Sequence, residues 1–359
     1  MTTTISHKTD FKTSYNQDDF LEYALRHQFG EIHCKVDVET GMKAIIAIHN
    51  TKLGPALGGC RFIEYPDTTT ALHDAMRLAR GMSYKSAIAK LPLGGGKSVM
   101  IKPPHAYNRD AYFHRFGEFI HSLNGRYITA LDSGTQLADM DIIAQHTPYV
   151  ASLSCHDGDP SFSTARGILR GIEAAVFYQL NKDNLNGLHI AIQGLGHVGF
   201  LLARHVTELG ARITVADIDS TRTELVVKEF GATVVSVNDI HKVPCDVFAP
   251  CALGAIINDT TIKEFQTTII AGAANNQLAH TYHGQLLHEK GILYAPDYVI
   301  NAGGVIFASG KYFHTAEQLV HEHIDGIRAS LLQVFARATQ ENRPTSDIAD
   351  RIASEILAE

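Results

Sequence analysis

Two lysines and one aspartate in the first half of the chain have side chains and surroundings suited to acid–base chemistry. Lys85 lies in the otherwise uncharged stretch GMSYKSAIA, and Lys97 directly follows three glycines in KLPLGGGKSVM. Most lysines are solvated surface groups, but a lysine removed from water is readily shifted in pKa and can act as a base. Asp132 ends an apolar stretch inside the turn ALDSGT, where catalytic groups commonly lie. Together they predict a cationic site for an anionic small molecule.

The glycine run before Lys97 is not a phosphate-binding loop. The pattern G-x-x-x-x-G-K-[ST] needs a glycine five residues before the last one, and that position is Leu91, followed by Pro92. Proline has no N–H to donate to a phosphate. We therefore expect the glycines to let a bulky ligand lie against the backbone beside Lys97.

The stretch GLGHVG (194–199) has the context of a dinucleotide-binding turn. It follows the apolar HIAIQ, opens the helical pattern VGFLLARHVTEL, and is followed roughly 20 residues later by Asp217 at the end of RITVAD. Glycines allow a tight turn and the approach of a pyrophosphate to the helix N-terminus. Asp217 can accept hydrogen bonds from a ribose 2′-hydroxyl and would repel a 2′-phosphate, so we expect NAD rather than NADP. The expected contacts within the turn are Gly194, Leu195, Gly196, His197, Val198 and Gly199. A glycine turn without any ligand is the weaker alternative.

The elements around these residues alternate between strand and helix patterns. In the first half, we expect strands at 42–50, 98–101 and 126–132, and helices at 67–87 and 110–123. In the second half, we expect a helix at 164–180, and strands at 188–193, 212–217, 245–250, 268–272 and 291–295. The last 45 or so residues are expected to form two helices. The alternation predicts an α/β protein whose second half is a doubly wound parallel sheet.

A Gly/Pro/Asp/Ser cluster, CHDGDPSFST, divides the chain into two predicted domains. The first, over 1–150, is an α/β substrate-binding and catalytic domain, to which the family resemblance given below adds a role in oligomerisation. The second, over 151–339, is a Rossmann-type NAD-binding domain, with a cleft between the two. A C-terminal helix over 340–359 is expected to pack back onto the first domain.

Composition and charge exclude several other classes of protein. The net charge of -7 argues against non-specific binding to nucleic acid or anionic membranes. No apolar run approaches the length of a membrane span and the N-terminus lacks an apolar signal core, so a cytoplasmic location is expected. The five scattered cysteines are expected to be reduced and mostly buried, and the histidines have no metal-binding spacing.

Seven stretches together resemble the glutamate/leucine/phenylalanine/valine dehydrogenase family, most closely its leucine dehydrogenase branch. They cover nearly the whole chain: LGPALGGCRF, ARGMSYKSAIAKLPLGGGKSVMI, RYITALDSGTQLADMD, GDPSFSTARGILRGIEAA, FAPCALGAIIND, AGAANNQL and YAPDYVINAGGVI. The resemblance implies an NAD-dependent, reversible oxidative deamination of an aliphatic L-amino acid (leucine, isoleucine or valine) to the 2-oxo acid and ammonia, by a homo-oligomer that belongs to branched-chain amino acid metabolism.

The resemblance also implies roles for individual residues. Lys85 holds the substrate α-carboxylate, Lys97 is the base that activates water, and Asp132 passes protons to and from the amino nitrogen. The remaining implied substrate contacts are Leu57, Gly58, Gly59, Met82, Ala130, Asn276, Val305 and Ala308. The remaining implied cofactor contacts are Thr164, Cys251, Ala252, Asn276 and Asp217.

The predicted side-chain pocket is apolar. The glutamate branch has a lysine at the position of Leu57, so a substrate carboxylate would be buried here without a partner, at a cost of several kcal/mol. Ala130, where the aromatic-preferring branch often has glycine, favours aliphatic substrates, whereas Ala308 could admit a larger side chain. The chain also departs from the leucine branch after GGVI, where it reads FASGK (307–311). An aromatic preference (phenylalanine or tryptophan) is therefore one alternative, and a non-catalytic dinucleotide-binding regulator, against which the presence of both lysines and Asp132 speaks, is another.

Overall fold

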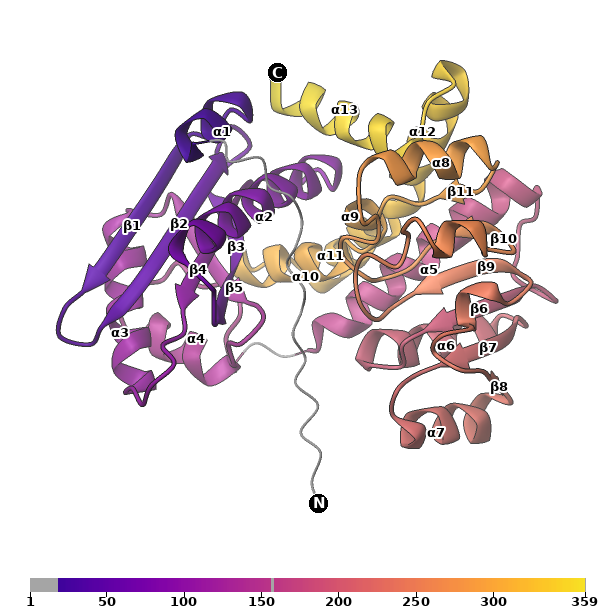
Figure 1. Cartoon of the computed structure of the whole chain (residues 1–359), viewed down its shortest axis with the longest axis horizontal. Coiled ribbons are helices and arrows are strands. Elements are labelled where there is room, and N and C mark those ends of the chain that lie inside the picture. Colours follow the sequence, from indigo (N-terminus) through magenta and orange to yellow (C-terminus); the bar gives the residue numbers. More distant parts are fainter. Residues whose placement is uncertain (1–18, 156–157, 359) are drawn as a thin grey trace.

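The computed structural model describes residues 19–155 and 158–358, which form two α/β units side by side (Figure 1). The first unit, in indigo and purple, is built on a five-stranded sheet. The second unit, from magenta to orange, is built on a six-stranded sheet whose hydrogen-bonded pairs are all parallel. The predicted two-domain α/β fold with a doubly wound second sheet is confirmed.

The first sheet has the strand order β1-β2-β4-β3-β5. β2 pairs antiparallel with both β1 and β4, while β3 pairs parallel with β4 and β5. The strand bounds are β1 Glu31–Asp37, β2 Met42–Asn50, β3 Ala56–Ile63, β4 Gly94–Ile101 and β5 Tyr127–Leu131. β4 begins four residues earlier than expected, so the three glycines before Lys97 lie inside a strand and not in a loop.

Helices cover both faces of the first sheet. Their bounds are α1 Phe20–Arg26, α2 Thr68–Ile88, α3 Arg109–Ser122 and α4 Leu137–Ala144. Because successive side chains of a strand point to opposite faces, Ile45 and Ala47 of β2 pack with α2, whereas Ile46 and Ile48 pack with α3. Asp67 caps α2 by accepting a hydrogen bond from Thr70 N at 2.7 Å.

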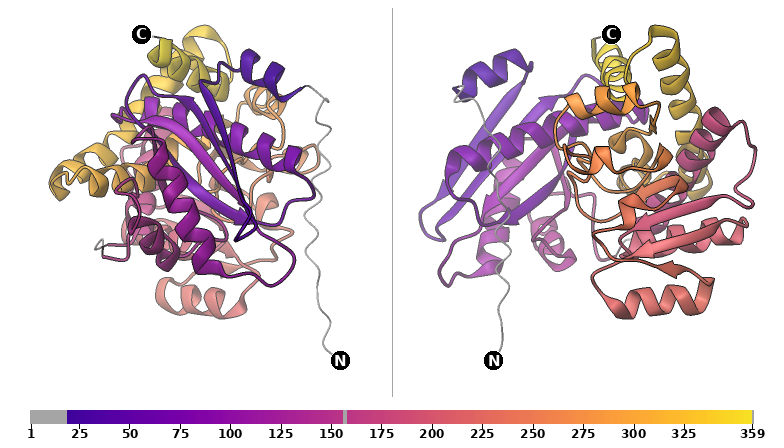
Figure 2. Two further views of the ribbon diagram at one scale, coloured as in Figure 1. Left: turned by 90° about the vertical axis from the view of Figure 1, so that its left-hand side faces the viewer. Right: turned by 45° about the vertical axis from the view of Figure 1, so that its right-hand side comes forward.

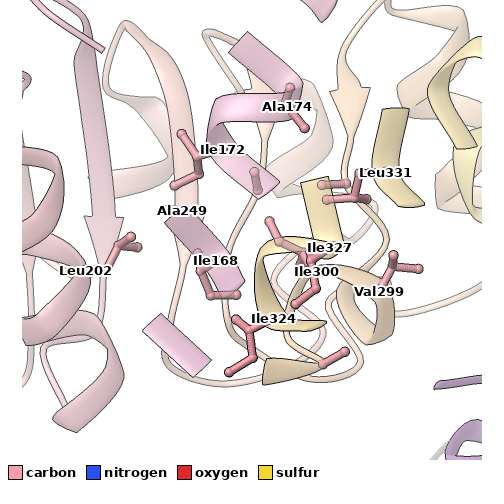
Figure 3. Close-up of a cluster of buried hydrophobic side chains, with 14 of the residues drawn as sticks. Ile168, Ile172, Ala174, Leu202, Ala249, Val299, Ile300, Ile324, Ile327 and Leu331 are labelled. Carbon is pink, nitrogen blue, oxygen red and sulfur yellow. The ribbon is translucent and has the colours of Figure 1, made fainter. Parts of the chain in front are cut away.

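The second sheet has the order β11-β10-β9-β6-β7-β8. The bounds are β6 His189–Gln193, β7 Arg212–Ala216, β8 Thr233–Val234, β9 Cys245–Pro250, β10 Thr267–Ile270 and β11 Leu293–Tyr294. One face packs on α5, α6 and α12, where Ile168, Leu202 and Leu331 belong to the cluster shown in Figure 3. The opposite face carries a smaller cluster around Phe248.

The helices of the second half fill the spaces around this sheet. Their bounds are α5 Pro160–Leu180, α6 His197–Glu208, α7 Ser220–Phe230, α8 Tyr282–Glu289, α9 Asp297–Ile300, α10 Gly303–Tyr312, α11 Glu317–Asp325, α12 Ile327–Glu341 and α13 Thr345–Ala358. Two short 3₁₀ turns lie at Ile240–Lys242 and Thr261–Lys263. The expected single helix before α13 is wrong, because the chain divides at Gly326 into α11 and α12. Glycine is a poor helix former, which explains why the helix is interrupted at this residue.

The last helix, α13, returns to the first unit (Figure 2). It packs against α2, where Ser354 Oγ donates to Tyr84 Oη at 3.0 Å, and Lys52 Nζ donates to the Ala358 carbonyl at 2.8 Å. The predicted domain limits at 150 and 339 stay predictions, and the second falls in the last turn of α12. No helix in the described ranges is long and apolar enough to cross a membrane.

Candidate active site

Neighbouring strands bring Lys97 and Asp132 into direct contact. Lys97 lies in β4, Asp132 directly follows β5, and β3 pairs with both strands. Lys97 Nζ forms an ion pair with Asp132 Oδ2, and Lys97 is only 6% exposed. Gly59 of β3 leaves space for this carboxylate, because a Cβ there would lie 2.5 Å from Asp132 Oδ2. The two residues that sequence reasoning placed together are therefore partners in the fold.

Burial tunes both lysines of the site. Burial and, after it, the positive charge of Arg61 lower the pKa of Lys97 to about 7, against the opposing charge of Asp74. Burial also lowers the pKa of Lys85 to about 8, against the charge of Asp297. An amine with a pKa near neutrality has an appreciable unprotonated fraction, which is the form needed for general-base chemistry.

Lys85 lies where the two units meet. From α2, its Nζ donates to Asn301 Oδ1 of the second unit at 2.7 Å. Asn301 Nδ2 in turn donates to the Ala273 carbonyl at 3.0 Å and to Asn275 Oδ1 at 2.8 Å. An ammonium has three donors, so donors of Lys85 remain for a substrate carboxylate. Sequence reasoning missed Asn301, although it stands in the quoted stretch YAPDYVINAGGVI, at the end of α9 and two residues before α10.

Arg61 is a second residue that the sequence analysis missed. It lies on β3, its Nη1 donates to Asp74 Oδ2 at 2.7 Å, and its Nε is 3.7 Å from Asp132 Oδ1. This Nε is buried and has no hydrogen-bond partner within the described residues. The only signal in the sequence is an arginine in the apolar stretch ALGGCRFI, directly after the paired glycines.

The glycine run before Lys97 has a different role from the one expected. A Cβ at Gly95 would lie 2.0 Å from Ser83 N of α2, and a Cβ at Gly96 would lie 2.8 Å from the Tyr127 ring. The protein's own atoms therefore fill the space, and the prediction that these glycines make room for a ligand is wrong. They allow α2 and β5 to approach β4 closely, which is what buries Lys97.

The turn GLGHVG is built as a dinucleotide site requires. Gly194 has φ +92°, and a Cβ at Gly199 would lie 2.0 Å from the Gly194 carbonyl oxygen, so these two glycines serve the turn and the close packing of α6. At Gly196, by contrast, a Cβ would meet no atom of the described chain within 4 Å. A pyrophosphate can approach the backbone there, next to the N-terminus of α6 at His197.

The neighbours of this turn are residues expected at the cofactor. Leu195 N donates to Asp217 Oδ2 at 2.6 Å, which places the Asp217 carboxylate beside the turn at the end of β7. Ala252 and Cys251 also border the turn. A Cβ added at Gly194 would lie 2.7 Å from the Ala252 Cβ, and one added at Gly199 would lie 3.4 Å from the Cys251 Cβ. The exposed half of the turn, including His197 and Val198, has no described ligand contact, so its role stays a prediction.

The predicted pocket residues share one core cluster that draws on both units. Leu57, 1% exposed, belongs to it, and Met82, Ala130 and Val305 pack against it. Ala308 lies half-buried on α10. The closeness of these side chains to a substrate stays a prediction.

Three further predicted residues, Asn276, Thr164 and Gly58, contact neighbouring elements. Asn276 has φ +52°, and its Oδ1 accepts from Arg77 Nη1 of α2 at 3.1 Å, so it joins the two units. Thr164 lies near the start of α5, where its Oγ1 would be 2.8 Å from a Cβ at Gly304. Gly58 packs on Gly96, whose carbonyl oxygen fills the place of its Cβ.

The cysteines are less buried than expected. All five are free thiols, but Cys34 and Cys155 are exposed and only Cys60 is fully buried. The expectation of buried thiols fails at Cys34, on the edge strand β1, and at Cys155, whereas Cys245 and Cys251 are half-buried. Among the described residues, no group of three His, Cys, Asp or Glu side chains could hold a metal ion.

Comparison with known proteins places this geometry in a family. A profile described as "Glu/Leu/Phe/Val dehydrogenase, dimerisation domain" matches residues 27–149, and one described as "Glutamate/Leucine/Phenylalanine/Valine dehydrogenase" matches residues 220–346. A leucine dehydrogenase from Geobacillus stearothermophilus is 48% identical over 94% of this chain and 93% of its own. A phenylalanine dehydrogenase from Thermoactinomyces intermedius is 44% identical over 89% of this chain and 88% of its own. The crystal structure of L-tryptophan dehydrogenase from Nostoc punctiforme superposes with a TM-score of 0.86 and 41% identity, over 94% of this chain and 98% of that one.

Proposed function

The chain belongs to the Glu/Leu/Phe/Val dehydrogenase family, and from this premise we propose that it catalyses the NAD-dependent, reversible oxidative deamination of an aliphatic L-amino acid to its 2-oxo acid and ammonia. Leucine, isoleucine and valine are the substrates. The observation that carries the proposal is the buried Lys97–Asp132 pair. A regulator that only binds a dinucleotide has no need of a buried base paired with a carboxylate.

Each charged group of the site has a separate task. Lys85, with donors to spare beyond its bond to Asn301, binds the substrate α-carboxylate. Asp132 accepts a proton from the α-amino group and returns one to the nitrogen that leaves. Lys97, whose pKa burial lowers to about 7, takes a proton from the water that attacks the imine carbon.

The second unit supplies the cofactor site, and its cofactor is NAD. Bound NAD would supply the acceptor for the hydride that leaves the substrate Cα. The open backbone at Gly196 would receive the pyrophosphate, and Asp217, beside the turn, would accept hydrogen bonds from the ribose hydroxyls. The same carboxylate would lie beside any 2′-phosphate and repel it.

The pocket prefers a branched aliphatic side chain and rejects glutamate. Leu57 offers only carbon atoms, so a second substrate carboxylate would lose its water without gaining a partner. Ala130 narrows the pocket by one methyl group relative to glycine, which is worth about 1–3 kcal/mol against a larger substrate.

An aromatic substrate is the second candidate, and one observation favours it. Ala308 is small and only half-buried on α10, so it leaves space at a position expected to line the pocket. The similarity to dehydrogenases of phenylalanine and tryptophan is consistent with that reading.

A panel of substrates tests the proposal. NAD reduction, followed by absorbance at alkaline pH, gives the specificity constants for leucine, isoleucine, valine, phenylalanine, tryptophan and glutamate. The expected result places the three aliphatic amino acids first and glutamate last. Phenylalanine or tryptophan ahead of leucine would support the second candidate, and glutamate in first place would contradict both.

The first unit also mediates assembly into a homo-oligomer. The profile that matches this unit is described as a dimerisation domain, and β1 is an edge strand of its sheet. Val36 and Val38, at the end of this strand, are 64% and 90% exposed. Light scattering on the purified protein tests this part, and a monomer at micromolar concentration would contradict it.

A further inference from the structure

A chain of charged side chains links the proposed catalytic pair to the second unit. Asp74, on α2, accepts from Arg61 at 2.7 Å through Oδ2 and from Arg77 at 2.9 Å through Oδ1. Arg77 also donates to Asn276 of the second unit at 3.1 Å. Tyr65 Oη donates to Asp74 Oδ2 at 2.7 Å. One carboxylate thus holds two arginines, one directed to the Lys97–Asp132 pair and the other to the neighbouring unit.

The end of this chain at Arg61 is incomplete. Its Nε is buried without a hydrogen-bond partner in the described structure, and it lies 3.7 Å from Asp132 Oδ1, just beyond hydrogen-bonding distance. Buried polar groups in folded proteins are nearly always paired. Arg61 Nε is therefore available to donate to the Asp132 carboxylate. Hydrogen bonds in active sites are often long without substrate and shorten only when the substrate is bound.

The chemistry of the site creates a need for this donor. Lys97 must lose its proton to act as a base, and Asp132 then loses the positive charge that its carboxylate faces in the ion pair. A guanidinium keeps its charge throughout the pH range of proteins. Arg61 can balance Asp132 while Lys97 is neutral, but only if it is held in place.

We propose that Arg61 and Asp74 are positioning residues, in which Asp74 holds the Arg61 guanidinium beside Asp132 so that Lys97 can give up its proton. The proposal rests on the proposed function, because it assumes that Lys97 is the base. Arg77 ties the same carboxylate to Asn276, so the arrangement is complete when the two units are in contact.

The charged and titratable groups that face Lys97 come from three elements. Asp132 follows β5, Arg61 and Cys60 lie on β3, and Asp74 and Lys85 lie on α2. The positive charge of Arg61 lowers the pKa of Lys97, whereas the negative charge of Asp74 raises it. Loss of charge alone would therefore move the titration of Lys97 in opposite directions in variants of the two residues, whereas release of Arg61 from Asp74 would move it to higher pH in both.

The test is the pH profile of kcat/KM for leucine in matched variants. Arg61→Gln should move the acid limb to higher pH by about one unit, and Asp74→Asn should also move it to higher pH, because the Arg61 guanidinium is no longer held beside Asp132. Arg61→Lys keeps the charge but loses the fork that fits Asp74, so it should restore the limb and leave kcat reduced. Arg115→Gln is the control, because Arg115 forms ion pairs with Glu39 and Glu118 on the surface of the same unit.

A second measurement does not depend on activity. Competitive labelling with acetic anhydride across pH, resolved by peptide mass spectrometry, titrates Lys97 against the exposed Lys35 in each variant, and the thermal midpoint of each variant reports its folding. The shifts in the Lys97 titration should match the kinetic ones in sign. Limbs that stay in place, or an acid limb that moves to lower pH in Asp74→Asn as loss of its charge alone predicts, would overturn the inference. A wild-type protein inactive on every amino acid would refute the proposed function, and the labelling would still decide the inference.

Discussion

The chain has two glycine-rich stretches, GGGK at 94–97 in the first unit and GLGHVG at 194–199 in the second, and they differ in what occupies the place of a side chain. At Gly95 that place is filled by α2 of the same chain, and at Gly196 it is open. The first stretch uses glycine to pack strands and a helix tightly around a lysine. The second uses Gly194 and Gly199 for the turn and its packing, and Gly196 to leave backbone accessible to a ligand. Glycine thus serves burial in one unit and, at one position, access in the other.

The largest expected effect follows from removing the buried Lys97 of the first unit. It should fall on turnover and leave NAD binding by the second unit unchanged. Lys97→Ala should lower kcat by about two to four powers of ten, the usual cost of losing a positioned base, while NAD affinity stays near that of the wild type. Steady-state kinetics and NAD titration measure the two quantities. Lys35→Ala, which changes an exposed lysine of the same unit, is the control. Near-normal turnover of Lys97→Ala would remove Lys97 from the catalytic role.

The comparison of the glycines can be tested by adding one methyl group to each stretch. Gly95→Ala places a Cβ against Ser83 N and should cost about 1–3 kcal/mol of unfolding free energy. Gly196→Ala meets no described atom and has φ -64°, so its stability should change by less than about 1 kcal/mol, with NAD affinity reduced about tenfold.

Urea unfolding gives the unfolding free energy of each variant, and NAD titration gives its affinity for NAD. Equal loss of stability in the two variants would show that the second stretch is packed as closely as the first. Unchanged NAD affinity in Gly196→Ala would place the pyrophosphate elsewhere.

A smaller effect is expected at the ribose end of the dinucleotide site. Asp217→Asn can still accept the hydrogen bond from Leu195 N but loses its charge. The specificity constant for NAD divided by that for NADP should fall. Repulsion of a 2′-phosphate disappears, while Arg222, whose Nη1 lies 3.9 Å from Asp217 Oδ2, remains. Kinetics with both cofactors measure the ratio. The same ratio in variant and wild type would place the ribose contact at another residue.

A dependence of stability on pH is also expected from the buried lysine. The pKa of Lys97 is about 7 in the fold, against 10.5 for an ordinary lysine. Between these values the unfolded chain binds more protons than the folded one, so the contribution of Lys97 to stability rises with pH. Lys97→Met should flatten this rise when unfolding free energies are compared at pH 7, 8 and 9. An unchanged slope would mean that Lys97 keeps an ordinary pKa.

The parts of the fold that follow local rules could be predicted from the sequence. The β-branched stretch 42–50 forms β2 with the expected bounds, and the strand, glycine turn and helix around GLGHVG form β6 and α6. Here periodicity and glycine placement reflect local geometry, so a single stretch contains the information.

The parts that depend on tertiary contacts could not. Glycines 94–96 resemble a loop in sequence, and only the approach of α2 explains their place inside β4. Arg61 and Asn301 entered the site through partners distant in sequence, Asp74 and Lys85. Charged or polar side chains in apolar strands and turns give too weak a signal to be assigned partners without the fold.

The transfer of the substrate's Cα hydrogen tests the central claim most directly. Leucine deuterated at Cα is incubated with the enzyme and NAD, and the reduced cofactor and the 2-oxo acid are analysed by mass spectrometry. The account predicts one deuterium in the reduced cofactor for each 2-oxo acid and each ammonia formed, with both products lost in Lys97→Ala. A reduced cofactor without deuterium, or reduction without 2-oxo acid, would contradict it.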